Sequence, residues 1–199
     1  MPDQYSDAKI IEPRAKFQLP DWVPKDFQDM VEELAKKNGM TAEEYLSWLW
    51  NTTTPEEAER YREIAETLAK ILMIQEDLSD LLAIQRAEIL KSKEELDTIE
   101  QLIHKAQTMM QQAEEYSEQG HYEKAEELFK QANSLLEFTS SYLAAEKEHS
   151  KKRDREIEEL NTELDNLTQE LLELTKGDDD LLNTAKVYAL LEWLYEVRQ

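Results

Sequence analysis

Apolar residues recur at alternating steps of three and four along two long stretches of this chain. Over residues 64–117, and again over residues 122–174, this spacing runs without a slip. An unbroken repeat of 3.5 residues gives a helix one apolar stripe, hereafter the seam, which needs a partner helix and imposes a left-handed supercoil. The pattern therefore predicts two long helices, at 55–119 and 121–176.

Only Gly120 separates the two predicted helices. Glycine adopts the positive φ values found at helix ends with little steric cost, so it favours a tight turn at this point. A turn this short leaves the second helix antiparallel to the first. We therefore expect a long antiparallel coiled-coil hairpin over residues 55–177, with its tip at Gly120.

Shorter helices are expected on either side of this hairpin. They are predicted at 26–38, 42–50 and 180–197. Thr41 with Glu44, and Thr54 with Glu57, have the spacing of capping boxes, in which a hydroxyl and a carboxylate bind the free amides of a helix start. The two threonines therefore indicate where the second and third helices begin.

Large apolar residues in the shorter helices supply a second region of core. All four tryptophans, at 22, 48, 50 and 193, lie outside the predicted hairpin. We expect an all-α fold in which the hairpin projects from a small helical base formed by both ends of the chain. Residues 1–54 then make up the base, and the C-terminal helix in 178–199 packs on it.

Composition agrees with this fold and removes several alternatives. The 199 residues include three glycines and five prolines, and none of the prolines follows Pro55, which leaves little turn chemistry for a sheet. The lack of cysteine removes disulfides and thiolate chemistry and fits a reducing compartment. No apolar stretch approaches the roughly 18 residues of a membrane span. We expect a cytoplasmic location (intracellular, or virion-associated) without membrane contact.

The seam turns polar midway along the predicted hairpin. Its polar residues are Gln85 and Ser92 in the first long helix and Glu146, Ser150 and Arg153 in the second. Polar groups at seam positions cost stability but fix the register or allow opening. Three interpretations stay open: a solvated, loosely packed middle, a hinge, and a docking point for a partner. The basic cluster of the chain also lies here, at Lys147, Lys151, Lys152, Arg153 and Arg155, among Glu146, Glu148, Asp154 and Glu156.

Aromatic, glycine and small residues form a regular pattern around the tip. Its members are Tyr116, Gly120, Tyr122, Ala125, Phe129 and Ala132. Over residues 109–136 this pattern resembles a tetratricopeptide hairpin. The resemblance implies two antiparallel helices joined by a tight turn. Since no second repeat follows, it does not imply a stacked array with a peptide-binding face.

Aromatic residues at the tip and in the base are candidate partner-binding positions. At the tip they are Tyr116, His121, Tyr122 and Phe129, and in the base they are Trp22, Trp48 and Trp50. The tip aromatics are either structural or a contact site. The three tryptophans exceed what short helices can cover internally, so we expect a homo-oligomer formed through the base.

Catalytic chemistry finds no support in the sequence. The three histidines are scattered, and Glu118–His121 and Glu146–His149 lack the further inward glutamates that complete a dimetal bundle site. A glycine-rich phosphate loop and a Ser-His-Asp context are lacking too. We therefore expect no enzyme activity, no cofactor and no metal site.

Residues 1–24 are expected to be irregular, apart from a short strand near 15–19. There Ala15, Phe17 and Leu19 alternate with Lys16 and Gln18, and two helices with Gly39 and Thr41 between them follow. Over residues 15–50 the arrangement resembles ribbon-helix-helix DNA-binding proteins. The resemblance implies that Lys16 and Gln18 read the major groove.

Charge bears on this resemblance and on the choice of partner. The chain has 23 Lys and Arg against 45 Asp and Glu, a net charge of −22, and each of its predicted segments is net acidic. An acidic surface disfavours phosphate binding, and anionic lipids would repel it. It also suggests an inhibitor that mimics nucleic acid by presenting carboxylates to a basic cleft, although a solvated surface explains the same charge.

The hypothesis favoured by these observations is a non-enzymatic structural or interaction protein. Assembly factors, adaptors and virion-type components all fit it. The acidic hairpin would bind or space protein partners, and the base would make homo-oligomer contacts. An acidic inhibitor that mimics nucleic acid, and a ribbon-helix-helix regulator, are the alternatives.

Overall fold

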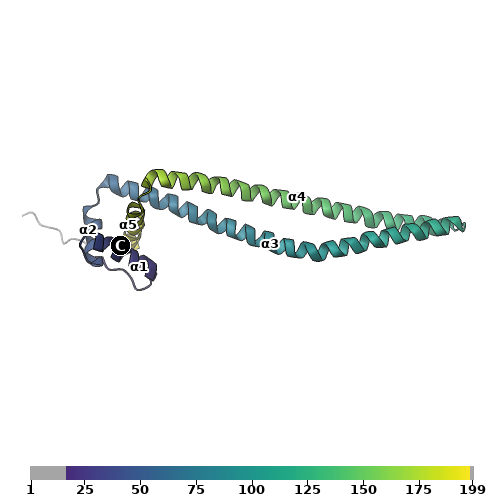
Figure 1. Ribbon diagram of the computed structural model, residues 1–199, viewed down its shortest axis with the longest axis horizontal. Coiled ribbons are helices and arrows are strands. Elements are labelled where there is room, and N and C mark those ends of the chain that lie inside the picture. Colours follow the sequence, from purple (N-terminus) through teal and green to yellow (C-terminus); the bar gives the residue numbers. More distant parts are fainter. Residues whose placement is uncertain (1–16, 198–199) are drawn as a thin grey trace, which may run out of the picture. The chain divides into compact units, whose positions relative to one another are not determined.

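The computed structural model describes residues 17–197, which form five helices and no strand (Figure 1). The helices are α1 (Lys25–Lys37), α2 (Ala42–Thr52), α3 (Pro55–Glu118), α4 (Tyr122–Thr175) and α5 (Asp179–Val197). Each lies within two residues of a predicted helix at both ends. The prediction of an all-α fold with a long helical hairpin is therefore confirmed.

The short strand expected at 15–19 is not present over residues 17–19, the part of it that the structure describes. The ring of Phe17 is buried and packs edge-on against Trp50, with 5.4 Å between centroids. Its backbone amide donates a hydrogen bond to the Ser47 hydroxyl over 3.4 Å. Because the side chain is buried and the amide has a partner, this segment needs no neighbouring strand.

Capping boxes begin α2 and α3, as the sequence predicts. At α3 the Glu57 amide donates to the Thr54 hydroxyl over 3.2 Å, and the Thr54 amide donates to the Glu57 carboxylate over 2.9 Å. Thr41 and Glu44 make the same pair of bonds at α2. Each box satisfies two amides that have no partner within the helix.

A three-residue connection centred on Gly120 joins α3 to α4. Gly120 has a φ of +80°, and the His121 amide donates to the Tyr116 carbonyl over 2.8 Å to close the end of α3. A Cβ at Gly120 would meet no atom within 4 Å. The turn therefore requires glycine for its backbone conformation and not for space.

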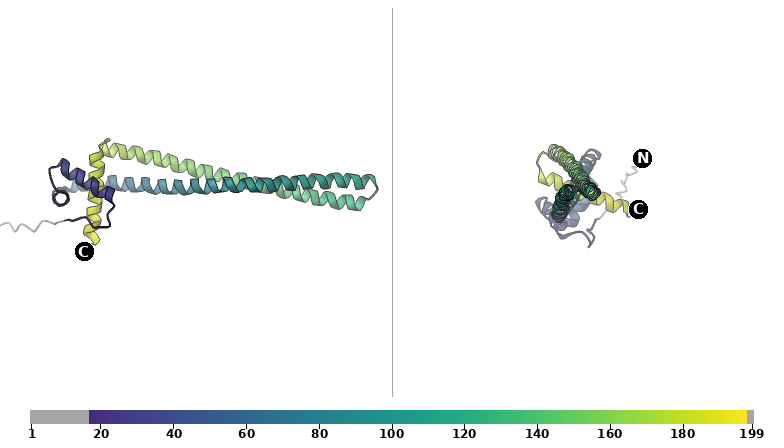
Figure 2. Two further views of the ribbon diagram at one scale, coloured as in Figure 1. Left: turned by 60° about the horizontal axis from the view of Figure 1, so that its bottom comes forward. Right: turned by 90° about the vertical axis from the view of Figure 1, so that its right-hand side faces the viewer.

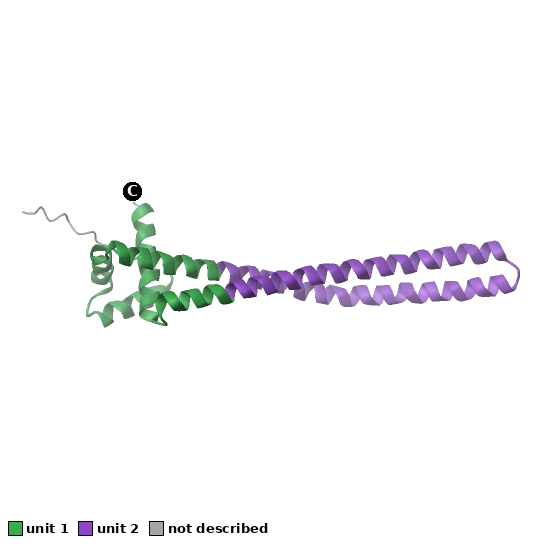
Figure 3. Ribbon diagram, turned by 90° about the horizontal axis from the view of Figure 1, so that it is seen from above, with its two compact units in different colours: residues 1–72, 165–199 green, residues 73–164 purple. Residues whose placement is uncertain are grey.

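The chain divides into two compact units (Figure 3). Unit 1 comprises residues 1–72 and 165–199, and unit 2 comprises residues 73–164. Helices α3 and α4 contribute to both units.

Unit 1 has a core formed by α1, α2, α5 and the first turns of α3. In two views α5 runs across this first part of α3 (Figures 1 and 2). The largest fully buried side chains of this core are Val31, Tyr45, Leu46, Ile64, Val187 and Leu191. Burying a side chain of this size contributes about 1.5–3 kcal/mol, so packing dominates the stability of the unit.

Polar contacts between helices surround the core of unit 1. The guanidinium of Arg62 on α3 donates twice to the Glu192 carboxylate on α5, over 2.8 and 2.6 Å, and this bond raises the pKa of Arg62. Lys37 on α1 pairs with Asp180 at the start of α5 over 2.8 Å. Arg62, Lys37 and Asp180 are about half exposed and only Glu192 is mostly covered, so these pairs orient the helices more than they stabilise them.

Unit 2 consists of the antiparallel parts of α3 and α4, which lie side by side in views taken at right angles (Figures 1 and 3). Near the turn the buried positions of its seam hold mostly small side chains. The members are Ile99, Ala106, Ala113, Ala125, Ala132 and Thr139. An alanine at every seventh residue allows two helices to approach closely. The left-handed supercoil itself stays a prediction.

Away from the turn the apolar seam of unit 2 is interrupted. On α3 no residue is buried between Leu78 and Ile99, and the seam positions Leu82, Ile89 and Leu96 are exposed. On α4 no residue of unit 2 beyond Thr139 is buried. Two helices alone cover only a narrow stripe, and polar seam residues do not exclude water from their apolar neighbours. The middle of the hairpin therefore exposes large apolar side chains.

Candidate interaction surfaces

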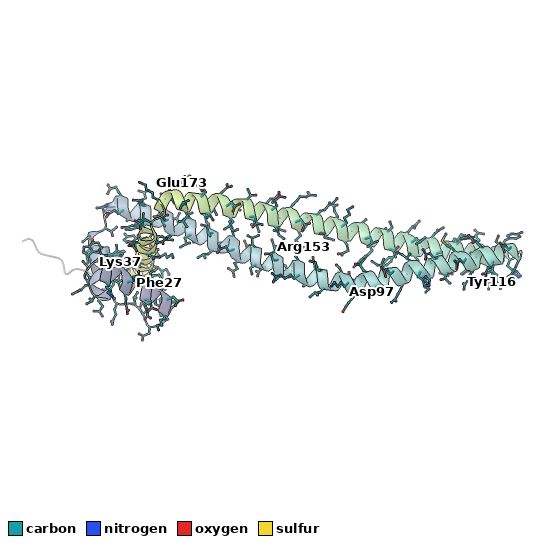
Figure 4. All side chains as sticks on the ribbon, viewed as in Figure 1. Phe27, Lys37, Asp97, Tyr116, Arg153 and Glu173 are labelled. Carbon is teal, nitrogen blue, oxygen red and sulfur yellow. The ribbon has the colours of Figure 1, made fainter. Side chains whose placement is uncertain are left out.

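The aromatic residues predicted at the tip divide into a cluster and an exposed ring. Tyr116, near the end of α3, lies 6.1 Å from the His121 ring in an edge-on contact, and Lys124 Nζ lies 5.6 Å from the Tyr116 ring centre (Figure 4). Phe129 is half-buried. Tyr122 is 71% exposed. The structure thus brings Tyr116 and His121 together and leaves Tyr122 on the surface.

The three tryptophans predicted as base contacts occupy different environments in unit 1. Trp50 is half-buried and packs against Phe17, Tyr188 and Tyr195, so it belongs to the core packing. Trp48 is exposed and lies 5.8 Å from Tyr45. Of the three tryptophans, Trp22 and Trp48 are therefore the ones exposed on the surface of unit 1.

Trp22 completes a surface pair that sequence reasoning did not assign as a site. Its ring, 60% exposed, lies edge-on to Trp193 of α5, with 5.6 Å between centroids, and Trp193 is 49% exposed. The two residues stand far apart in the sequence, and only the packing of α5 brings them together. In the sequence, this pair was indicated only indirectly, by the presence of all four tryptophans outside the predicted hairpin.

Two of the five polar seam residues of the hairpin contact the opposite helix, and the other three are described by their burial. Gln85 is half-buried, and its amide donates to the Asp154 carboxylate over 3.3 Å. Arg153 forms an ion pair with Glu88 across the two helices, and its side chain is largely buried (Figure 4). Ser92 is half-buried, whereas Glu146 and Ser150 are exposed.

Gln85 and Arg153 thus bridge the helices through Asp154 and Glu88, which the seam pattern did not select. These partners could have been found from the antiparallel pairing of the helices. It places residues at similar sequence distances from Gly120 side by side. A long polar side chain reaches the opposite helix from a position beside the seam. The middle of unit 2 is therefore held by polar bridges where the turn-proximal part is held by packed alanines.

A third polar bridge joins the helices closer to the turn. The Tyr142 hydroxyl donates a hydrogen bond to the Glu95 carboxylate. This bond raises the pKa of Tyr142 to about 12 and lowers the pKa of Glu95. A hydrogen bond to a carboxylate favours the charged carboxylate and the neutral phenol, which explains both directions.

The described part of the chain, residues 17–197, contains neither a candidate metal-binding group nor a candidate membrane span. Within this range no group of three or more histidine, aspartate and glutamate side chains has the geometry to bind a metal ion. None of the described helices combines the length and apolarity required to cross a bilayer. The absence of catalysis and of cofactors stays a prediction.

No protein family, curated protein or solved structure matches this chain. The resemblances to a tetratricopeptide hairpin and to ribbon-helix-helix proteins stay predictions. For the second, Lys16 lies outside the described residues, and Gln18 is exposed.

Proposed function

We propose that this chain is a non-enzymatic interaction protein that uses its acidic helical hairpin to bind or space protein partners. Cytoplasmic assembly factors, adaptors and virion-type components are the classes that fit. The observation that supports the proposal is the exposure of large apolar side chains along unit 2, among them Tyr122 and Phe138. Exposed apolar surface of this kind is typical of protein-binding sites.

Unit 1 is proposed to form a homo-oligomer. Trp22, Trp48 and Trp193 are all exposed large aromatic residues of this unit. Aromatic residues are enriched at protein interfaces because they bury a large apolar area with few rotatable bonds. A second copy of the chain would cover these rings.

Affinity capture tests the proposed function directly. The full chain is immobilised and exposed to lysate of the organism that encodes it. The lysate is divided into two halves, one of which is treated with nuclease. The proteins bound from each half are identified by mass spectrometry. We expect a discrete protein partner in both halves. Capture that disappears after nuclease treatment would contradict the proposal and favour the ribbon-helix-helix alternative.

The same experiment separates binding through packed surfaces from mimicry of nucleic acid. A net charge of −22 favours the mimic only if the partner is a nuclease or another nucleic-acid enzyme. The affinity of such a complex would fall steeply between low and moderate salt, because salt at 0.1 M screens the attraction between exposed charges beyond about 10 Å. We expect the captured partner to remain bound over this range.

A further inference from the structure

We propose that one side of unit 2 is an interface with a second copy of the chain, in which two hairpins pack face to face and antiparallel. This side is formed by Leu82, Ile89 and Leu96 of α3 and Leu143 of α4, hereafter the apolar side. The inference goes beyond the proposed function, which assigns self-association to unit 1 alone.

The four residues of the apolar side lie on the same side of the hairpin. Leu82, Ile89 and Leu96 are spaced by seven residues, close to two helical turns, so they share one face of α3. Each follows a buried or half-buried seam residue by four positions, as Leu143 does on α4. Four residues turn a helix about 40° past a full turn. In two antiparallel helices that face each other, this turn is towards the same side of the pair.

Helices α3 and α4 contact each other over the opposite side of the seam. Glu88, Glu95 and Tyr142 each follow a seam residue by three positions instead of four, and all three are half-buried. They bridge the helices there, because Tyr142 bonds to Glu95 and Glu88 pairs with Arg153. The residues of the apolar side are 39% to 56% exposed. The hairpin therefore covers one side of its seam and leaves the other uncovered.

The apolar side is large enough for a stable dimer. Towards the turn it continues, at the same spacing, in half-buried Ile103 and Met110 of α3 and Phe129 and Leu136 of α4. From residue 82 to residue 110 a helix extends for about 42 Å, and two helices side by side are about 20 Å wide. The product is on the order of 800 Å², which is what each partner of a stable complex buries. A second hairpin matches this width, whereas one helix covers only part of it.

The charges around the apolar side are nearly balanced, although the chain is strongly acidic. The exposed charged residues that stand three or four positions from its exposed and half-buried members are Arg86, Lys93, Glu100, Glu114, Glu126, Glu146 and Lys147. Of the acidic ones, Glu126 is already paired with Lys130. Three basic residues thus face three unpaired acidic ones, so two copies of this surface can approach without net repulsion.

An antiparallel arrangement brings identical apolar residues of two copies together. Leu96 and Leu143 lie at one level of the hairpin, because Glu95 and Tyr142, which precede them in the sequence, are hydrogen-bonded. A two-fold axis at this level places each of the two leucines next to its own counterpart in the second copy. Dimers of identical chains most often use the same surface patch on both copies in this way.

The same axis matches the residues on either side of it. Lys93 and Glu100 are about equally distant from Leu96, in opposite directions along α3, so Lys93 of each copy lies opposite Glu100 of the other. Ile89 lies opposite Ile103 for the same reason. Each of these contacts occurs twice in the dimer, which favours the antiparallel direction.

Cysteine crosslinking tests the interface on the full chain. The chain contains no cysteine, so an introduced one is its only thiol. With a short bis-maleimide, we expect Leu143→Cys to give a covalent dimer. Ala145→Cys is the matched control: position 145 is exposed too, but two residues turn the helix by about 200°, so it faces away and should give no dimer.

A mixture of two variants tests the antiparallel direction. Arg86→Cys and Gln107→Cys change exposed residues at about equal distances from the axis. In an antiparallel dimer the two copies of residue 86 are about 30 Å apart, as are those of residue 107, whereas residue 86 lies opposite residue 107. We therefore expect a covalent dimer from the mixture and none from either variant alone.

Substitutions in the apolar side test its contribution to affinity. They are made together with Trp22→Ser and Trp193→Ser, so that contacts through unit 1 do not mask the result. Leu96→Glu with Leu143→Glu should raise the dissociation constant of the dimer at least tenfold in sedimentation equilibrium, because four carboxylates then meet at the axis. Ile84→Glu with Leu90→Glu, at exposed positions outside the apolar side, should leave it unchanged. Unchanged helical circular dichroism confirms that each variant folds.

Three results would overturn the proposal: no covalent dimer from position 143, equal dimer from positions 143 and 145, and a dissociation constant that Leu96→Glu with Leu143→Glu does not change. Covalent dimers from positions 86 and 107 alone, with none specific to the mixture, would contradict the antiparallel direction. The proposed function is tested separately. If position 143 gives no dimer but the chain still captures a discrete protein from lysate, the function stands and the interface fails.

Discussion

Alanine at the seam shows how single residues determine the packing of this hairpin. Ala106, Ala113, Ala125 and Ala132 are buried although each contributes only a methyl group. A methyl group leaves little space between two helix backbones, so the helices themselves fill the interface. These positions are consequently sensitive to any increase in side-chain volume.

Ala132→Leu is therefore expected to destabilise the chain by about 1–3 kcal/mol, since it adds three carbon atoms to a fully buried position. Ala145→Leu, at an exposed position of the same helix, is the matched control and should change the free energy of unfolding by less than about 0.5 kcal/mol. Urea unfolding followed by circular dichroism measures both. Equal effects of the two variants would contradict the close packing of the seam.

The Tyr142–Glu95 bond gives a second prediction at the scale of the residue. Because the bond raises the pKa of Tyr142 to about 12, its stabilising effect is complete below pH 10 and is lost as pH rises through 12. The lowered pKa of Glu95 means that the effect is also lost as pH falls below 4.5, through the pKa of the folded state.

Ring NMR signals of labelled tyrosine follow this ionisation directly. We expect Tyr142 to ionise near pH 12, and Glu95→Gln to return its pKa towards the ordinary value of 10. Ionisation of Tyr142 near pH 10 in the unmodified chain would show that the bond does not form in solution.

Among the elements, the connection between α3 and α4 depends on one backbone conformation. Gly120→Ala should cost about 1–2 kcal/mol, because a φ of +80° is unfavourable for a residue with a Cβ. Gly120→Asn should cost less, because asparagine adopts positive φ more readily. Thermal unfolding of the two variants measures the difference. Equal stability of all three chains would mean that the connection adopts another conformation.

Most of the fold was predictable from the sequence because its elements are long and have local signals. The 3.5-residue repeat predicted α3 and α4, and the capping threonines predicted where α2 and α3 begin. The expected strand was wrong over residues 17–19, because the burial of Phe17 against Trp50 is a tertiary contact that alternation cannot reveal.

The candidate sites were less predictable because they depend on residues that are distant in the sequence. Periodicity selected Gln85 and Arg153 but not their partners Asp154 and Glu88, which lie beside the seam. The pairing of Trp22 with Trp193 depends on where α5 packs. The apolar repeat in a sequence identifies which face of a helix is buried. Which residues of another helix contact that face depends on how the helices pack.

For the whole molecule, the exposed tryptophans of unit 1 predict self-association. Sedimentation equilibrium at micromolar concentration should detect an oligomer, and Trp22→Ser with Trp193→Ser should shift it towards the monomer. Tyr122→Ser, which changes an exposed aromatic residue in unit 2, is the control and should leave the oligomer intact. A strict monomer in the unmodified chain would rule out an interface through unit 1.

The central claim is that unit 2 of the hairpin contacts a protein partner, and site-specific photo-crosslinking tests it most directly. A benzophenone amino acid is placed in the full chain at Ile89, at Tyr122, at the exposed control position Glu163, or at Trp48 of unit 1. After irradiation in nuclease-treated lysate, we predict a discrete crosslinked protein from position 89 or 122 and none from position 163. A discrete product formed only from position 48, or the same products from every position, would contradict the account.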